Sequence, residues 1–475
     1  MYHNGMMTSC DNGNLKRLKI LLLAGALLIS PLASGFLPAQ APMRLSPDEA
    51  VDRALRNNLG LESARVSTGT ARRAAGLAWN QFVPTIDLGA SLLRLNSAPP
   101  GMTLPLPPPA GPIVIDGGSQ WMIAGSLSAT LNLNFAIFED MRRARMEHEL
   151  GLISYGKARA QIERDVRKAY HNMLLLQENV GLLSGSLENA DRQVQIAQAN
   201  FNAGLAPELT LLQAQVAREN LRPVIDQAEG GLRLSMMQFA MFLGLPHDTE
   251  FELVPVAAGI SPIPLDTAGL ISRAAAGRPD VMELSQNIRI MNSIRQSSRQ
   301  RLFSPTISLG WNADPTFRGP WWDGISDFDN WNQQSGALRV TLGFRLNGLL
   351  PFGVERQGVQ ALEDQIRIAN IGLAQMIRGT EIEIHNLVLM LERIQISMEV
   401  LEQTVALAER SFQLTEQAYR AGLIDLLQVQ NAEQSLRQAL VQLHEQQFNY
   451  LNGLIDLEYA LGVPFGTLAS TGSFD

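Results

Sequence analysis

The chain has 475 residues, of which 46% are hydrophobic and 18% are charged, and its formal net charge at pH 7 is −8. This composition excludes a disordered chain and a chain buried throughout in a membrane. The acidic balance argues against nucleic acid as a partner. The single cysteine, Cys10, lies in the segment assigned below to a signal peptide, so we expect a mature protein without disulfides or cysteine metal sites.

The first 41 residues have the pattern of a secretory signal peptide. Lys16, Arg17 and Lys19 precede the apolar run 20–29, and small residues follow at 33–35 and 39–41. A transmembrane anchor is the alternative, but a bilayer needs about 20 apolar residues and Pro31 follows the run closely. Pro42 would follow a cut after Ala41, which leaves the cleavage site open.

Residues 42–246 form a first unit that begins with a helix and a strand. Ser46 and Pro47 are typical of a helix start, and the helical pattern continues to residue 81. From Pro84 the apolar residues alternate, which predicts the first strand of a β-hairpin over 83–137. The stretch 98–118 has no periodicity and is expected to be a loop, after which 121–135 alternates again.

The helical period then returns in a long helix over 139–203 and a return helix over 207–243. The turn between them is Ala203-Gly204-Leu205, where glycine suits the residue just past a helix end. Pro223 should kink the return helix or break it. Residues 247–265 carry three prolines and are expected to be an irregular connector.

The same order of helices and strands is predicted again in residues 266–464. The segment 82–89 recurs as 303–310 with six of eight residues identical. A β-hairpin over 304–347 encloses a loop over 313–334, and a long helix over 354–420 turns at Ala421-Gly422-Leu423 into a return helix over 423–462. Residues 465–475 form a tail. The chain is therefore predicted to be a tandem repeat.

The long helix of each repeat carries an apolar seam with unbroken 4,3 spacing, which is typical of a coiled coil. At 1.5 Å per residue the second helix would be about 100 Å long. Since the two seams match at an offset of 218 residues, we expect the two long helices of the chain to be each other's partners. The seam residues are Leu373, Ile377, Thr380, Ile384, Leu387, Leu391, Ile394, Met398, Leu401, Val405, Ala408, Phe412, Thr415 and Tyr419 in the second repeat, and Ile162, Val166, Ala169, Met173, Leu176, Val180, Leu183, Leu187, Ala190, Val194, Ala197 and Phe201 in the first.

The four strands each have one apolar and one polar face, which suits a barrel with lipid outside and water inside. Four strands do not close a barrel in lipid, so several copies must contribute to one barrel. The alternative is a soluble sandwich with a shared apolar core. The polar face, expected to line the barrel lumen, includes Ser128, Thr130, Asn132, Arg339, Thr341 and Arg345.

The chain resembles the outer-membrane efflux proteins of the TolC family. The resemblance covers nearly the whole mature chain and rests on the repeat, on Pro-Thr-Ile before a strand, and on the order of the motifs 419–423, 427–436 and 461–464. It implies a mixed α/β membrane protein: a homotrimer in which four strands per chain make a twelve-stranded transmembrane barrel, continuous with a long antiparallel coiled-coil α-helical barrel that forms a periplasmic tunnel.

The resemblance also implies function and partners. Such a protein is an exit duct in the cell outer membrane, spanning into the periplasm of a Gram-negative type envelope. It serves a tripartite efflux or type I secretion system with a periplasmic adaptor and an inner-membrane efflux pump or ABC exporter. A periplasmic coiled-coil adaptor and a structural protein without a pore remain the alternatives.

The resemblance places a periplasmic entrance and adaptor contacts at the helix-hairpin tips. The tip residues are Ala203, Gly204, Leu205, Ala421, Gly422 and Leu423, and the entrance residues are Tyr419, Gln428, Asn431, Thr210 and Gln213. Tyr419 matches a tyrosine involved in closure, whereas Gln428 and Asn431 replace aspartates of relatives. A neutral amide ring would attract cations less than a carboxylate ring, so we expect weaker cation selectivity and weaker divalent block. Alternatively, both are merely solvated polar residues.

The chemistry of an enzyme is not visible in the sequence. The six histidines are scattered without a metal-binding motif, and no P-loop, nucleophile elbow or dinucleotide fingerprint is present. We therefore expect a passive duct without cofactor or metal.

Overall fold

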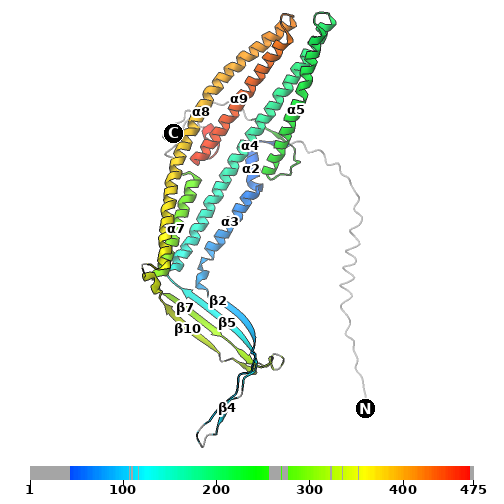
Figure 1. Cartoon of the computed structure of the whole chain (residues 1–475). Coiled ribbons are helices and arrows are strands. Elements are labelled where there is room, and N and C mark those ends of the chain that lie inside the picture. The colour runs from blue at the N-terminus through cyan, green and yellow to red at the C-terminus, as the bar shows by residue number, and fades with distance from the viewer. Residues whose placement is uncertain are drawn as a thin grey trace, which may run out of the picture. The chain divides into compact units, whose positions relative to one another are not determined.

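The computed structural model describes residues 43–105, 107, 111–115, 117–255, 269, 277–320, 322, 324–333, 335–350 and 352–470. Helices predominate, together with an antiparallel sheet (Figure 1). None of the helices in these ranges combines the length and the apolar character needed to cross a membrane. The expected signal peptide, residues 256–265 of the expected connector and residues 471–475 of the tail lie outside the described part.

Two long helices, each followed by a return helix, make up the largest part of the helical structure. The sharp turns between them allow each pair to run antiparallel. The helices are α2 (Pro47–Asn57), α3 (Leu59–Gly76), α4 (Ala136–Asn202), α5 (Glu208–Phe242), α7 (Pro279–Phe303), α8 (Val354–Arg420), α9 (Leu426–Leu461) and α10 (Thr467–Ser470), with short 3₁₀ turns η1 (Ala78–Phe82), η2 (Phe328–Asn330) and η3 (Leu346–Leu349).

The single helix expected over 46–81 is wrong, because Asn58 divides it. Asn58 has an extended backbone (ψ 120°) that ends α2, and its side-chain oxygen accepts hydrogen bonds from the amides of Gly60 and Leu61 at the start of α3. Asparagine stabilises the chain more as the N-cap of the next helix than as an interior residue of the previous helix. The start at Ser46 follows the expectation, with a capping box to Glu49.

Helix α5 runs through Pro223 without the break that was one expectation. Pro223 is exposed, as is Glu219, whose carbonyl would otherwise accept its hydrogen bond. Water can hydrate that carbonyl, so the missing donor costs less than it would in a core.

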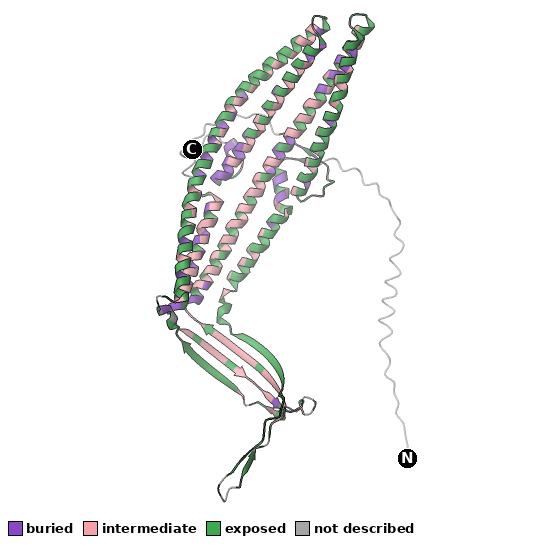
Figure 2. Ribbon diagram, viewed as in Figure 1, coloured by how far each residue is buried: buried purple, intermediate pink, exposed green. Residues whose placement is uncertain are grey.

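The seam of α8 is packed as expected, since none of its fourteen residues is exposed. Its expected partner is wrong. Helix α8 packs chiefly against α9 and also against α7, and α4 packs against α5, α7, α3, α9 and α2. Buried residues gather between these helices (Figure 2). A 4,3 spacing indicates that a helix packs on the seam but does not specify which helix. Because a tight turn connects α8 to α9, the return helix is the nearest helix in space.

Chain contacts separate a small unit, to which Met43–Arg44 and Glu250–Glu252 belong, from the rest of the described chain. It contains most of a two-stranded sheet of β1 (Met43–Leu45) and β6 (Phe251–Leu253), in which Arg44 and Glu252 form an exposed ion pair of 3.4 Å. The connector expected over 247–265 is therefore not wholly irregular. A strand of three residues is too short to be recognised from the alternation of apolar residues.

The main sheet joins both repeats in the order β2 (Thr85–Arg94), β5 (Trp121–Leu133), β7 (Thr306–Ala313) and β10 (Gly336–Gly343), all antiparallel. The register brings the alternate apolar residues onto one face, because Ala129 lies opposite both Ile86 and Trp311, and Trp311 lies opposite Leu338. Directly opposed residues share a face, so this apolar face is continuous across all four strands.

Short strands occupy parts of the two stretches expected to be loops. In the first, β3 (Met102–Leu104) pairs with β4 (Ile113–Ile115). In the second, β8 (Thr316–Arg318) pairs with β9 (Trp331–Asn332) and with the start of β5. Proline and glycine conceal such short pairings in the sequence.

Candidate functional site

The two hairpin tips are built alike. In the first, the amide of Leu205 donates to the Asn200 carbonyl at 2.8 Å, and Gly204 has φ 72°. In the second, the amide of Leu423 donates to the Ala418 carbonyl at 2.9 Å, and Gly422 has φ 71°. A glycine in the left-handed region ends each long helix, as its position predicted. The following leucines are 79% and 77% exposed at the ends of the hairpins.

An apolar cluster lies just behind the tips and takes residues from all four hairpin helices. Its buried members are Ala197, Leu211, Ala214, Tyr419, Leu426 and Val429. The cluster links the two hairpins, because α4 and α5 belong to one and α8 and α9 to the other. Separation of the tips would therefore expose this apolar surface to water.

Tyr419 is buried in this cluster and is 5% exposed. Its hydroxyl is buried without a hydrogen-bond partner in the described part of the chain. Burial raises the pKa of Tyr419 above its usual value. In one chain, Tyr419 is thus an apolar contact between hairpins. Phe201 occupies the equivalent position in the first repeat, 218 residues earlier.

The other entrance residues lie on the first turns of the return helices. Thr210 and Gln213 of α5 are equivalent to Gln428 and Asn431 of α9 at an offset of 218 residues. Gln213, Gln428 and Asn431 are exposed and Thr210 is half-buried. The two repeats thus present matching pairs of uncharged polar side chains beside the tips.

The interface between the hairpins, formed by α4 and α9, is unusually polar below the tip cluster. Lys168 pairs with Asp456 at 2.7 Å, and the Nδ1 atom of His171 lies 3.1 Å from the Asn452 side-chain oxygen. Burial lowers the pKa of His171. By contrast, the interior of the second hairpin is apolar between α8 and α9, with Ile384, Leu391 and Leu457 fully buried.

Glu433 belongs to the same polar interface. Its Oε1 atom is buried without a hydrogen-bond partner in the described part of the chain. Burial raises the pKa of Glu433, although polar contacts with Ser186 and Asn189 of α4 and the charges of Arg437 and Arg192 oppose the shift. Glu433 is therefore a partly buried titratable group between the hairpins.

Sequence reasoning missed this polar interface, although α4 carries a signal for it. Polar residues recur every seven positions beside the apolar seam, at Asn172, Asn179, Ser186, Gln193 and Asn200. Ser186 and Gln193 are buried, and Asn179 is half-buried. A second stripe with the same heptad period predicts a second helical contact, here to α9.

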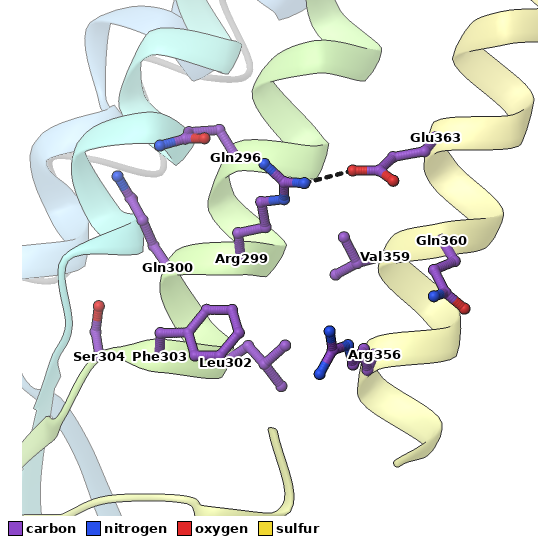
Figure 3. Close-up of a pocket in the computed structure, with 10 residues that line it drawn as sticks. All are labelled: Gln296, Arg299, Gln300, Leu302, Phe303, Ser304, Arg356, Val359, Gln360 and Glu363. Atoms are coloured by element: carbon purple, nitrogen blue, oxygen red, sulfur yellow. Dashed lines mark hydrogen bonds and ion pairs between the residues drawn. The ribbon is translucent and has the colours of Figure 1, made fainter. Parts of the chain in front are cut away.

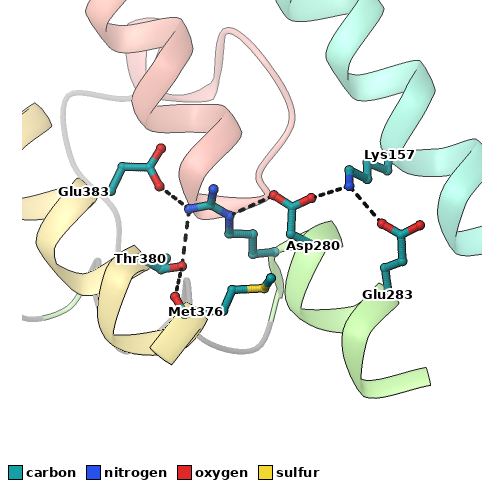
Figure 4. Close-up of polar contacts among 7 residues, drawn as sticks. Lys157, Asp280, Glu283, Met376, Thr380 and Glu383 are labelled. Atoms are coloured by element: carbon teal, nitrogen blue, oxygen red, sulfur yellow. Dashed lines mark hydrogen bonds and ion pairs between the residues drawn. The ribbon is translucent and has the colours of Figure 1, made fainter. Parts of the chain in front are cut away.

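A charged cluster ties the start of α7 to α4 and α8 (Figure 4). Lys157 pairs with Asp280 at 2.6 Å and with Glu283 at 2.8 Å, and Arg278 contacts Asp280, Glu383 and the hydroxyl of Thr380. The hydrogen bonds that Lys157 donates to Asp280 and then to Glu283 raise the pKa of Lys157, and the same bond to Glu283 lowers the pKa of that carboxyl group.

The polar face of the sheet brings together five of the six expected lumen residues. Ser128 lies opposite Asp87 and Asn312, and Thr130 opposite Thr85 and Gly310. Asn132 lies opposite Ser308, whose hydroxyl donates to it at 2.6 Å. Arg339 and Thr341 face the same side through Gly310 and Ser308. Arg345 lies beyond the end of β10.

Comparison with known proteins identifies the family. A family model described as outer membrane efflux protein matches residues 50–237 and 270–463. The chain belongs to the outer membrane efflux protein family. The resemblance inferred from the motifs is confirmed, and with it the localisation in the outer membrane and the periplasm.

Relatives and solved structures match over most of this outer membrane efflux protein. It is 22% identical over 434 residues to the pyoverdine export outer membrane protein OpmQ of Pseudomonas putida, covering 87% of this chain and 85% of the relative. It is 19% identical over 355 residues to nodulation protein T of Rhizobium leguminosarum bv. trifolii, with 73% of each covered. The fold matches the Campylobacter jejuni CmeC outer membrane channel with a TM-score of 0.69 and 18% identity, over 88% of this chain and 85% of that one.

Proposed function

We propose that this outer-membrane efflux protein assembles as a homotrimer whose sheets close into a twelve-stranded barrel. The observation that carries the proposal is the sheet itself. In the part of the chain that the structure describes, β2 and β10 each pair on one side only. Open edges are not tolerated in lipid, so the edge strands would pair between copies. Leu88, Leu338 and Leu342 of the apolar face are 85%, 74% and 72% exposed, as lipid-facing residues would be.

A second apolar stripe on α8 supports assembly from several copies. Ile382, Leu389, Ile396, Leu407 and Leu414 are all exposed, and most follow heptad spacing on a face separate from the seam toward α9. A helix with two apolar seams needs two helical partners. Helices α9 and α7 leave this stripe exposed in the part of the chain that the structure describes, so a neighbouring copy would cover it.

The trimer would act as a passive exit duct of a tripartite efflux or type I secretion system. An inner-membrane efflux pump or ABC exporter would supply the energy, and a periplasmic adaptor would contact the hairpin tips. The exposed Leu205 and Leu423 suit this contact, because each follows a glycine turn that fixes its direction. An apolar knob at the end of a rigid hairpin can fill a pocket on a partner.

The entrance would be closed by the apolar cluster around Tyr419 and lined by uncharged side chains. Thr210 and Gln213 with Gln428 and Asn431 would give two amide and hydroxyl rings in a trimer. Without carboxylates at positions 428 and 431, the channel should select cations weakly.

The test is single-channel conductance of the detergent-extracted protein in a planar bilayer, with its oligomeric mass measured in parallel. A trimer with discrete conductance steps is expected, and Gln428→Asp with Asn431→Asp should increase both cation selectivity and block by divalent cations. A water-soluble monomer or dimer without channels would refute the duct. Strong divalent block of the unaltered protein near neutral pH would refute the neutral entrance.

A further inference from the structure

A groove of about 550 Å³ lies between the end of α7 and the start of α8, close to the point where α7 leads into β7 (Figure 3). Its polar wall includes Arg299, Gln300 and Arg356, and its apolar wall includes Phe303 and Val359. One side of the groove thus offers hydrogen-bond donors and the other offers an apolar surface.

The groove carries positive charge in an acidic protein. Arg299 pairs with Glu363 at 2.5 Å, whereas Arg356 forms no ion pair within the residues that the structure describes. From residue 284 to 303 α7 has four arginines and no acidic residue, although the chain has a net charge of −8. The Oε1 atom of Gln300 is buried and lacks a partner in the described chain. These features suit an anion with both donor and acceptor groups.

The position of the groove indicates where its ligand comes from. The groove with Arg299 and Arg356 reaches the end of the sheet through Ser304, which lies between α7 and β7. Phe303, 51% exposed, lies three residues before β7 begins.

We propose that this groove binds the phosphate headgroup of a membrane phospholipid whose acyl chains lie on the apolar face of the sheet. The guanidinium groups of Arg299 and Arg356 would donate to phosphate oxygens, and Phe303 and Val359 would contact the first acyl carbons. The inference rests on the proposed function, because it requires the apolar face to lie in a bilayer. A basic groove at the end of that face lies at the level of the headgroups.

The lipid is favoured over free phosphate as the source of the anion. Free phosphate would use only the arginines and would leave the apolar wall in water. A phospholipid satisfies the arginines and also covers Phe303 and Val359, so both walls contribute to its binding.

The experiment is native mass spectrometry of the detergent-extracted protein titrated with phosphatidylglycerol. Arg356→Gln removes a charge that has no ion pair among the described residues, so it should leave folding intact and lower the bound-lipid fraction about five- to tenfold. Arg299→Gln should act in the same direction. Arg367→Gln is the matched control: Arg367 lies on the same face of α8, eleven residues and about 16 Å farther along, and should not change lipid binding.

Two results would overturn the proposal. One is equal lipid retention by Arg356→Gln, Arg299→Gln and the unaltered protein. The other is displacement of the lipid by millimolar inorganic phosphate, which would assign the groove to a free anion. Conductance measured on the same preparations separates this inference from the duct: channels without a specific lipid would refute the lipid site alone.

Discussion

At the scale of single residues, several polar groups lie where apolar packing is expected. Thr380 interrupts the seam of α8, and its hydroxyl accepts a hydrogen bond from Arg278 while donating to the Met376 carbonyl at 3.0 Å (Figure 4). Thr380 therefore contributes a hydrogen bond to the charged cluster that holds α7 against α8. The sequence shows the interruption but not its cause, because Arg278 lies 102 residues away in the chain.

Tyr419 gives the first prediction. Its hydroxyl is buried without a partner in the described chain, so Tyr419→Phe should leave stability unchanged or raise it by about 1 kcal/mol. Tyr419→Ala should cost about 3 kcal/mol and open the entrance, because it leaves a cavity between the hairpins. Thermal unfolding and bilayer conductance measure the two effects. If Tyr419→Phe were as disruptive as Tyr419→Ala, the hydroxyl would have a partner in the assembled protein.

Glu433 gives the second prediction. Burial raises its pKa in the folded state, so its contribution to stability is present at low pH and is lost as pH rises through that raised pKa. Glu433→Gln keeps the shape and removes the charge. It should therefore raise the melting temperature at pH 7 and leave it nearly unchanged at about pH 3, where the carboxyl is protonated in both states. A melting temperature lowered equally at both pH values would contradict the assignment.

At the scale of elements, the four turns that follow the hairpin helices look alike in sequence but differ in their surroundings. Gly204, Gly244, Gly422 and Gly462 all have φ between 67° and 72°. A Cβ at Gly204 or Gly422 would meet open space, whereas at Gly462 it would lie 2.5 Å from the Gly277 carbonyl oxygen and at Gly244 2.6 Å from the Asn57 Cβ. The turns at the tips need glycine for its backbone alone. The turns after the return helices need it for close packing as well.

The third prediction compares these turns directly. Gly422→Ala should cost about 1 kcal/mol, the strain of a left-handed alanine. Gly462→Ala adds a clash with the backbone of Gly277 and should lower the free energy of unfolding by more, about 3 kcal/mol. Denaturant unfolding of the two variants gives the comparison, with the unaltered protein as reference. Equal costs would mean that the backbone near Gly277 moves aside freely.

Helices were easier to predict than their neighbours in space. Periodicity indicated both long helices and both return helices, and the glycines indicated the turns, since these signals are local. The partner of each seam was predicted incorrectly because a seam specifies only that a helix must cover it. The heptad of polar residues from Asn172 to Asn200 was the overlooked sign of a second contact.

At the scale of the whole molecule, the sheet was the most predictable part. Alternation in β2, β5 and β10 predicted which residues share a face, and the register brings them together through β7. The edge partners of β2 and β10 and the closing of the entrance could not be read from one chain, because both would depend on contacts between copies.

The fourth prediction tests the orientation of the sheet. Val340 lies on the apolar face and Thr341, next to it, on the polar face. Val340→Arg should destabilise the inserted barrel by about 2–4 kcal/mol, because a charge would face lipid, and should therefore lower the yield of trimer. Thr341→Arg, facing water, should have little effect. The yield of heat-modifiable trimer on SDS gels from outer-membrane fractions measures both. Equal loss in the two variants would contradict a lipid-facing apolar side.

The two helix interfaces should respond differently to the ionic strength of the medium around the protein. The ion pair of Lys168 with Asp456 between the hairpins is partly exposed and is screened by salt, whereas the packing of Ile384 and Leu391 inside the second hairpin is not. Rising ionic strength would therefore weaken the joint between hairpins before it weakened either hairpin. A duct built in this way would loosen below its entrance as the salinity of the periplasm rises, while the apolar cluster at the tips and the walls stayed intact.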